Sequence, residues 1–434
     1  MNTQYDAFLG IISSGEMLSL SSAKFASPLG LNVLGTKVKQ SFSNVFVKIY
    51  NLEINDFQIV KKDIKRVVKN YHRILVGLTL IAGNVLKSFE LAKWLKELGC
   101  DVIVGGPEIN ELSANHFSTL PIVDGIIIGF GEHIIAEIVR DGLKQKVYTT
   151  PQYFDFQNSA VDYSLLFRIK DYGGVSMLWG GDCHLCNKRC YFCSRKKRGF
   201  GWRNPRIVWE ELRYAHQKGI KKIYNTADTV AVSLGQLRQL AETKPLELAE
   251  MKIKCFINAT QVTDETAELL KRLNAWAAVG IESLARVAAV GKGGTTMEDN
   301  FRAIKILAQH GVPMILTFVM GLPKETKESI EADAKEILRI VREYRDSIYW
   351  VTVSPLLVTL GSQAFEDSLT QNLPTRHEWE FYNPFLLTEQ YFKKFCSVKI
   401  DTVYKTIAYL KDKISEIAPE IIFDSKGLDP KRWK

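Results

Sequence analysis

The sequence has no long apolar run and no cationic segment at its start. A membrane-spanning helix needs roughly 20 apolar residues, and the longest candidate, Pro313–Leu322, is about half that long. The opening residues MNTQYDAFLGIISSGEM lack the positively charged beginning of a secretory signal peptide. We therefore expect a cytoplasmic protein that does not bind a membrane.

Several common chemical signatures are also missing. There is no G-x-x-x-x-G-K-[ST] phosphate-binding loop, and the seven histidines are dispersed, with no Ser-His-Asp or Cys-His pairing. The net charge of +9 is modest for 434 residues, and the basic residues are mostly scattered, so we expect no nucleic-acid partner. At 46% hydrophobic and 24% charged residues, the composition is that of an ordinary globular protein.

Cysteine is the residue whose distribution is unusual. Of seven cysteines, Cys100, Cys255 and Cys396 stand alone, whereas the other four lie between Cys183 and Cys193. In a protein that is not secreted, such a group indicates a metal site rather than disulfides.

The first 150 residues alternate short apolar strands with amphipathic helices, one of them at Leu86–Leu98. This alternation predicts an α/β domain over residues 1–150, with a Rossmann-like parallel sheet that binds ligands at the carboxyl ends of its strands. Two turns at those ends, Gly105–Glu108 and Gly129–Glu132, either are simply tight or let a flat cofactor or a neighbouring domain approach the backbone. The expected strands are Phe8–Ile12, Val45–Tyr50, Ile74–Leu78, Val102–Val104 and Gly125–Ile128.

After a polar, aromatic connector at 151–170, the alternation restarts. Six strand patterns separated by helical patterns predict a partial (β/α)6 barrel over 171–360, with its active face at the carboxyl ends of the strands. Residues 361–434 form a C-terminal helical extension, with a helical stretch from about Thr388 to Ile417. The six strands are Val175–Trp179, Lys222–Asn225, Ile253–Ile257, Ala278–Ile281, Met314–Met320 and Ile348–Ser354.

Cys186, Cys190 and Cys193 follow the first of these six strands. Three thiolates cannot complete a tetrahedral zinc site, but they can ligate three corners of an iron–sulfur cube and leave the fourth iron open to a small molecule. A zinc site completed by Cys183 or His184 is the alternative, and Cys183 could also be a fourth ligand of the cluster.

The run C-x3-C-x2-C, with an aromatic residue before the last cysteine, resembles the radical S-adenosylmethionine (AdoMet) superfamily. The resemblance implies that Cys186, Cys190 and Cys193 hold a [4Fe–4S] cluster whose open iron binds AdoMet. An electron from the cluster then cleaves AdoMet, and the resulting 5′-deoxyadenosyl radical abstracts hydrogen from an unactivated carbon. The cofactor carries this chemistry, while the protein supplies position and protection.

Further segments agree with the resemblance in chain order. Arg203-Asn204-Pro205, then Val208 and Glu210, resembles the segment that follows the cluster loop. Phe192, together with Tyr191, would lie against the adenine. Asp228 would lie near the amino end of AdoMet, Glu282 and Ser283 near its ribose, and Gly321 near the adenine. Lys324 stands where relatives often have glycine.

The N-terminal domain resembles the cobalamin-binding domain that precedes many radical AdoMet enzymes. The likeness rests on Ser27-Pro28-Leu29-Gly30-Leu31 and on the two glycine-bearing turns. The histidine-ligand signature D-x-H-x-x-G is absent from this domain. Some relatives bind cobalamin without that histidine, so cobalamin is possible, and the alternative is that the domain holds a peptide substrate.

Three functions fit these features. The first is L-to-D epimerisation of residues in a ribosomally made peptide, because the chain loosely resembles the proteusin epimerases of the polytheonamide type; Cys396 would donate the hydrogen atom. The second is cobalamin-dependent methylation of an unactivated carbon in a peptide or small natural product. The third is a non-catalytic iron–sulfur or zinc protein. Either enzyme would need an electron donor such as flavodoxin or ferredoxin.

Overall fold

The structure is a computed structural model of the 434-residue chain. It describes residues 3–14, 26–81, 83–151, 153–180, 190–193, 201–231, 233–292, 294–370 and 384–425. Cys183 and Cys186 therefore lie outside the described residues, whereas Cys190 and Cys193 are among them.

The chain divides into two compact units. One comprises Met1–Gly181 and Lys197–Tyr224, and the other comprises Asp182–Lys196 and Asn225–Lys434. The boundaries between the two units thus fall at 181–182, 196–197 and 224–225, whereas the sequence pattern predicted a connector between domains at 151–170.

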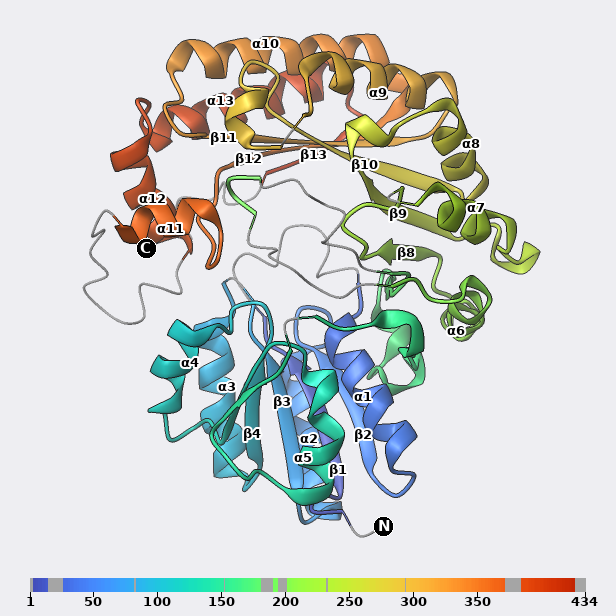
Figure 1. The fold of residues 1–434 in the computed structure, drawn as a ribbon, viewed down its shortest axis with the longest axis vertical. Helices are drawn as coiled ribbons and strands as arrows, with labels where there is room; N and C mark the ends of the chain where they lie inside the picture. Colours follow the sequence, from blue (N-terminus) through green and yellow to red (C-terminus); the bar gives the residue numbers. More distant parts are fainter. Residues whose placement is uncertain are drawn as a thin grey trace. The chain divides into compact units, whose positions relative to one another are not determined.

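The first unit contains a parallel sheet with the order β2-β1-β3-β4-β5-β6 (Figure 1). All five expected strands are present. The Val147–Thr149 strand, β6, was not expected, because its sequence is too short to show a period. The other strands are β1 (Ala7–Ile12), β2 (Phe46–Asn51), β3 (Ile74–Thr79), β4 (Asp101–Gly105) and β5 (Gly125–Ile128).

Helices connect these strands, as the alternating pattern predicted. Every residue of β1 is buried, which is usual for a parallel strand covered on both faces. The helix expected at Leu86–Leu98 is α3. The helices of this unit's sheet are α1 (Leu29–Ser41), α2 (Phe57–Asn70), α3 (Val85–Glu97), α4 (Glu111–Ser118) and α5 (Ile135–Asp141).

The second sheet has the linear order β13-β12-β11-β10-β9-β8-β7, so its end strands do not pair with each other. All six expected strands are present, and the open order confirms a partial rather than a closed barrel. The strands are β7 (Val175–Met177), β8 (Lys222–Asn225), β9 (Lys252–Ile257), β10 (Ala275–Glu282), β11 (Met314–Met320), β12 (Ile348–Pro355) and β13 (Ile422–Asp424).

Helices cover one face of strands β9 to β13 (Figure 1). Residues that point to the helices are fully buried, for example Ile253, Cys255 and Val279, whereas the opposite face of β9 carries Phe256, whose side chain is 41% exposed. This alternation has the period of two that a strand imposes. The connecting helices are α6 (Pro205–Gln217), α7 (Leu234–Glu242), α8 (Asp264–Arg272), α9 (Met297–Gln309) and α10 (Lys327–Tyr344).

The helical stretch expected from about Thr388 to Ile417 consists of two helices. Helix α12 (Pro384–Phe395) ends before Cys396, and α13 (Ile400–Ile417) begins after it. The break has a tertiary cause: the Ser397 amide donates to the carbonyl oxygen of Glu325 at 3.2 Å, outside any helix. The extension also contains α11 (Gln363–Thr370) and supplies β13, which pairs in parallel with β12.

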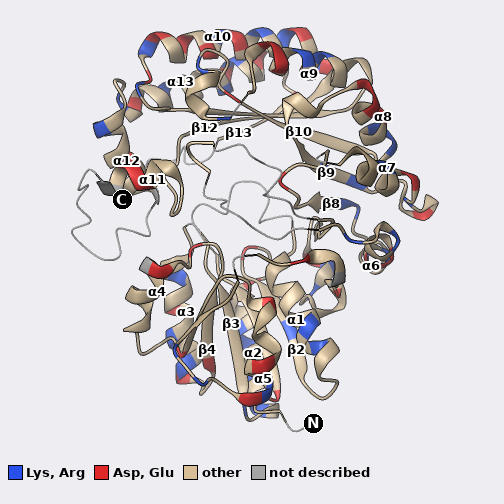
Figure 2. Cartoon of the chain, viewed as in Figure 1, with Lys and Arg blue, Asp and Glu red and all other residues tan. Residues whose placement is uncertain are grey.

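Charged residues of both signs lie on the outer helices. Figure 2 shows Lys, Arg, Asp and Glu interspersed along α10, where Arg339 pairs with Glu336 and Glu343. Among the residues that the structure describes, no helix is both long and apolar enough to span a bilayer.

Candidate functional site

Cys190 and Cys193 lie on one short turn in the second unit. The Cys193 amide donates to the carbonyl oxygen of Cys190 at 3.0 Å, and both residues are half-buried. Two thiols on one turn suit a shared iron–sulfur cluster, for which thiolates are the usual ligands. Cys186, the third expected ligand, lies outside the described residues, so the complete triad stays a prediction.

Two aromatic residues, Tyr191 and Phe192, lie between these cysteines. The hydroxyl of Tyr191 donates to Oδ2 of Asp367, at 2.8 Å, on helix α11. Phe192 is half-buried on the same turn. The expected contact of either ring with the adenine stays a prediction.

The end of β10 carries a buried ion pair. Glu282 has a left-handed backbone with φ of 66°, which is uncommon for any residue but glycine. Its Oε1 lies 3.3 Å from Nζ of Lys292, and the two side chains are 12% and 8% exposed. The Lys292 ammonium also donates to the carbonyl oxygen of Gly280. A Cβ on Gly280 would collide with Glu282 and Lys292, so a side chain at that position would displace the pair.

Ser283 is committed to a second buried network. Its hydroxyl donates to Oδ2 of Asp333 at 2.7 Å and accepts from the Arg286 amide at 2.9 Å. The other oxygen of Asp333 accepts from the amides of Leu284 and Ala285, at 2.8 and 2.7 Å. Burial raises the pKa of Asp333, and these three donors oppose the rise. Ser283 thus fixes the turn after β10, and its contact with AdoMet stays a prediction.

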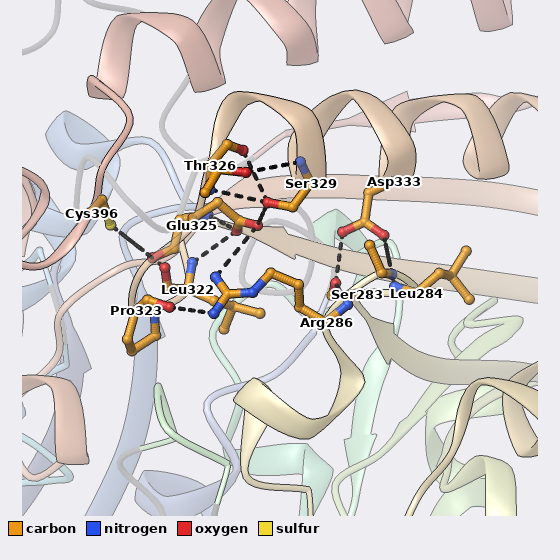
Figure 3. A network of polar contacts seen from close by, with 12 residues as sticks. Ser283, Leu284, Arg286, Leu322, Pro323, Glu325, Thr326, Ser329, Asp333 and Cys396 are labelled. Carbon is orange, nitrogen blue, oxygen red and sulfur yellow. Dashed lines mark hydrogen bonds and ion pairs between the residues drawn. The ribbon is translucent and has the colours of Figure 1, made fainter.

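The turn after β11 is organised by Glu325 (Figure 3). Oε2 of this buried carboxylate accepts from the amides of Gly321 and Leu322, at 2.9 and 3.0 Å, and Oε1 accepts from the hydroxyl of Ser329 at 2.7 Å. Gly321 has φ of 96°, and a Cβ there would lie 2.0 Å from the ring of Phe392. A side chain therefore does not fit at Gly321, and the expected place of this residue near the adenine stays a prediction.

Arg286 joins the turns after β10 and β11. Its guanidinium donates to the carbonyl oxygen of Pro323 at 2.6 Å and lies 3.8 Å from Glu325 (Figure 3). The structure therefore brings Glu282, Ser283 and Gly321 to the carboxyl ends of two adjacent strands. Cys396 reaches the same turn, where its thiol donates to the carbonyl oxygen of Gly321.

Asp228 lies two strands away, in the turn after β8. It is half-buried, and this turn is joined to the end of β9 by a hydrogen bond from the Val230 amide to the carbonyl oxygen of Phe256, at 2.8 Å. Its expected role at the amino end of AdoMet stays a prediction.

In the first unit, Arg203 holds the chain next to the end of β7. Its guanidinium is 1% exposed, donates to the carbonyl oxygen of Leu178 at 2.9 Å and lies 2.5 Å from Glu211. The sequence pattern had singled out Glu210, but that side chain is exposed and pairs with Arg213. The helical register of α6 decides between two adjacent glutamates, and sequence alone did not show it.

The two glycine-bearing turns of the first sheet lie close to the backbone at the end of a neighbouring strand. A Cβ on Gly106 would lie 2.6 Å from the carbonyl oxygen of Leu80, and one on Gly129 would lie 2.6 Å from that of Thr150. Both glycines therefore allow close contact with the end of the neighbouring strand. Ser27 connects α1 with β7, since its hydroxyl accepts from the Ser176 amide at 2.9 Å.

Sequence reasoning missed Lys292, Asp333, Asp367 and Arg286, all of which act through distant partners. Glu325 directly follows Lys324, and the signal for it was its position four residues after Gly321.

Comparison with known proteins identifies this region. Residues 183–337 match the model of the radical SAM superfamily, the family that uses AdoMet with an iron–sulfur cluster. The chain contains a radical SAM domain. It is thus a radical SAM enzyme, and a [4Fe–4S] cluster and AdoMet are its cofactors.

The similarity to three other proteins covers more of the chain than this domain. The chain is 24% identical to an "Uncharacterized methyltransferase PH0819" of Pyrococcus horikoshii, over 89% of this chain and 88% of that protein. The fold matches TsrM of Kitasatospora setae, a radical AdoMet methyltransferase solved with cobalamin and a [4Fe–4S] cluster, at 17% identity and a TM-score of 0.68, covering 96% of this chain and 92% of that one. It also matches OxsB, a cobalamin-dependent radical enzyme, at 14% identity and a TM-score of 0.62, covering 85% and 61%.

Proposed function

We propose that this radical SAM enzyme is a cobalamin-dependent methyltransferase that acts on an unactivated carbon of a peptide or small natural product. The observation that carries the proposal is the breadth of the similarity: the likeness to the methyltransferase TsrM extends over 96% of the chain, so it includes the N-terminal parallel sheet as well as the radical SAM domain. The relative from Pyrococcus horikoshii, matched over 89% of the chain, also bears a methyltransferase name.

The first unit contains features that suit cobalamin. In α/β sheets, ligands bind at the carboxyl ends of the strands, where the first turn of α1 begins. Asn32 lies in that turn, is fully buried, and neither atom of its amide has a hydrogen-bond partner among the described residues. An amide with an open donor and an open acceptor matches the amide groups around a corrin ring, so Asn32 and the turns at 105–108 and 129–132 are the residues we assign to it.

The second unit supplies the AdoMet side of the proposal. Cys190 and Cys193 would hold the cluster with Cys186, and Glu282 at the end of β10 presents a carboxylate fixed by Lys292. When bound, the cluster supplies the electron that cleaves AdoMet, and cobalamin carries the methyl group to be transferred. The protein's own part is to hold these groups at the carboxyl ends of its strands.

The similarity favours methylation over epimerisation, because TsrM and the Pyrococcus horikoshii relative both bear methyltransferase names. Cys396, the donor that epimerisation would use, directs its thiol to the carbonyl oxygen of Gly321. The proposed enzyme also needs an electron donor, such as flavodoxin or ferredoxin.

The test uses the full-length chain, reconstituted without oxygen with iron, sulfide and hydroxocobalamin. We expect a retained cobalamin absorbance band and, with AdoMet deuterated in its methyl group, products that carry the label when candidate peptides or natural products from neighbouring genes are supplied. The Cys193→Ala variant is the control, because it lacks a cluster ligand. Protein that retains no cobalamin would overturn the proposal. In a parallel reaction with unlabelled AdoMet in deuterated water, deuterium entering the product from solvent would favour epimerisation instead.

A further inference from the structure

Tyr191, between the two described cluster cysteines, has its main chain fixed on both sides. Its amide donates to the carbonyl oxygen of Val290 at 2.8 Å, and its carbonyl oxygen accepts from the Ala364 amide at 3.1 Å. Val290 ends the short helix after β10, and Ala364 lies in the first turn of α11. The first-turn amides of a helix have no partner within the helix, so the carbonyl oxygen of Tyr191 acts as a cap for α11.

The Tyr191 side chain is held by the same helix. Its hydroxyl donates to Oδ2 of Asp367 at 2.8 Å, and Oδ1 of Asp367 accepts from the Gln363 side chain at 2.7 Å. Hydrogen bonds to a carboxylate are among the strong ones. One helix therefore fixes both the main chain and the side chain of a single residue.

The ring of Tyr191 is also packed from the C-terminal side. It lies 6.2 Å from the ring of Tyr391 on α12, which is fully buried and stacks on Phe395 at 5.1 Å. Both α11 and α12 follow the last residue of the radical SAM match, which ends at 337. The C-terminal extension of this chain thus supplies contacts to the turn that carries two of the predicted cluster ligands.

We propose that Tyr191 and Asp367 form a clamp that positions Cys190 and Cys193 for the [4Fe–4S] cluster. In this arrangement Tyr191 is a positioning residue whose side-chain partner is α11 and not the adenine of AdoMet. The clamp depends on the cluster assignment within the proposed function, but not on cobalamin or on the substrate. Residues that orient metal ligands in this way tune metal affinity and electronic properties without contacting the metal.

The experiment compares Tyr191→Phe and Asp367→Asn with the wild type, all as reconstituted full-length protein. Tyr191→Phe removes this hydrogen bond, whereas Asp367→Asn weakens it by replacing the charged acceptor with a neutral amide oxygen. We expect a full complement of iron in both, with iron release to a chelator roughly tenfold faster, in line with the value of a hydrogen bond to a charged group. We also expect an altered electron paramagnetic resonance signal of the reduced cluster. The double variant should release iron no faster than the singles, because the two residues share one interaction.

Tyr5→Phe is the matched control, since it removes an equivalent bond of 2.8 Å, from Tyr5 to Asp101, in the first unit. It should leave both cluster readouts unchanged. Wild-type release rates and spectra in both clamp variants would overturn the proposal. So would a loss of AdoMet affinity in Tyr191→Phe with unchanged iron release, which indicates an adenine contact. If Tyr191→Phe does not fold, Asp367→Asn alone decides.

Failure of the clamp and failure of the proposed function give different results. A wild-type protein that holds its cluster but transfers no methyl group defeats the function and leaves the clamp variants informative. A wild-type protein that methylates its substrate while the clamp variants behave normally defeats the clamp alone.

Discussion

The thiol of Cys396 donates a hydrogen bond to the carbonyl oxygen of Gly321, with 3.4 Å between sulfur and oxygen. The carbonyl oxygen of Leu322 lies 3.7 Å from the same sulfur. Cys396 directly follows the last residue of α12, and its thiol contacts two carbonyl oxygens in the turn after β11. This geometry suits a residue that stabilises the turn after β11.

We expect Cys396→Ala to keep methyl transfer close to the wild-type rate. Removing the hydrogen bond lowers the free energy of unfolding by about 1 kcal/mol, without touching the groups that we assign to the cofactors. Product mass and chemical denaturation provide the two measurements. A variant that still cleaves AdoMet but forms no product would instead show that the thiol takes part in the reaction.

Cys396 should also react slowly with alkylating agents in the folded protein. Burial raises the pKa of its thiol to about 12, so at pH 8 the thiolate fraction is on the order of 10⁻⁴, compared with about 0.2 for an ordinary thiol. Alkylation by iodoacetamide, followed by peptide mass spectrometry, should accelerate with rising pH up to about 12. Rapid labelling of folded protein at pH 8 would contradict this.

The sign of the linked stability effect follows from the same shift. The folded protein holds the Cys396 proton more tightly than the unfolded chain does. This contribution to stability is complete below the unfolded pKa and is lost as pH rises from about 8.5 towards 12. Cys396→Ala should therefore show a shallower loss of stability in that alkaline range than the wild type.

Lys292→Met should destabilise the second unit by about 3 kcal/mol, because it leaves the buried Glu282 carboxylate without its cation. Adding Glu282→Gln should recover part of the loss, since the remaining charge is then removed. Denaturation of the single and double variants measures this coupling. Equal stability of Lys292→Met and the wild type would mean that the ion pair contributes nothing.

The fold was largely predictable because its signals are local. Continuous apolar runs such as β1 and β11 show a buried parallel strand in the sequence itself. Two strands of three residues, β6 and β13, were missed, whereas the equally short β7 was predicted because it lies in the longer, mostly apolar segment Val175–Trp179. The helix break at Cys396 was missed for a different reason: it is made by contacts to residues 321–325, which are distant in sequence.

The candidate site was predictable only where a motif kept its residues close together. The cysteine triad and Gly321 were named from such motifs, and their roles towards the cluster and AdoMet stay predictions. Asp333 looks like any other acid on the outer face of an amphipathic helix, and only the fold shows that it is buried against Ser283. Asp367 gave no signal at all, because its partner Tyr191 precedes it by 176 residues.

Gly321→Ala and Gly235→Ala should change stability in opposite directions. A Cβ on Gly321 would overlap the ring of Phe392 in a left-handed backbone conformation, so we expect a loss of about 3 kcal/mol or more. Gly235 lies within α7, and a Cβ there meets nothing within 4 Å, so alanine should stabilise the protein by about 1 kcal/mol. Denaturant unfolding of both variants checks the pair. A tolerated Gly321→Ala would show that Phe392 is free to move away.

Lys324→Gly should make the protein more stable, although it removes a side chain from the turn after β11. Lys324 is exposed and has φ of 59°, a left-handed conformation that costs a residue with a Cβ roughly 1–2 kcal/mol relative to glycine. Glycine also makes the unfolded chain more flexible, which offsets part of the gain, so we expect a net increase of about 0.5 kcal/mol.

The matched control is Lys335→Gly, the same change at an exposed position within α10, where glycine costs about 1 kcal/mol. Opposite signs for the two variants in denaturant unfolding would show that backbone conformation, and not the loss of a lysine, determines the result. Because the Lys324 amide donates to the carbonyl oxygen of Phe395 at 2.9 Å, a bond that glycine retains, the attachment of α12 to this turn should survive the substitution. A destabilised Lys324→Gly would mean that the lysine side chain itself holds the turn.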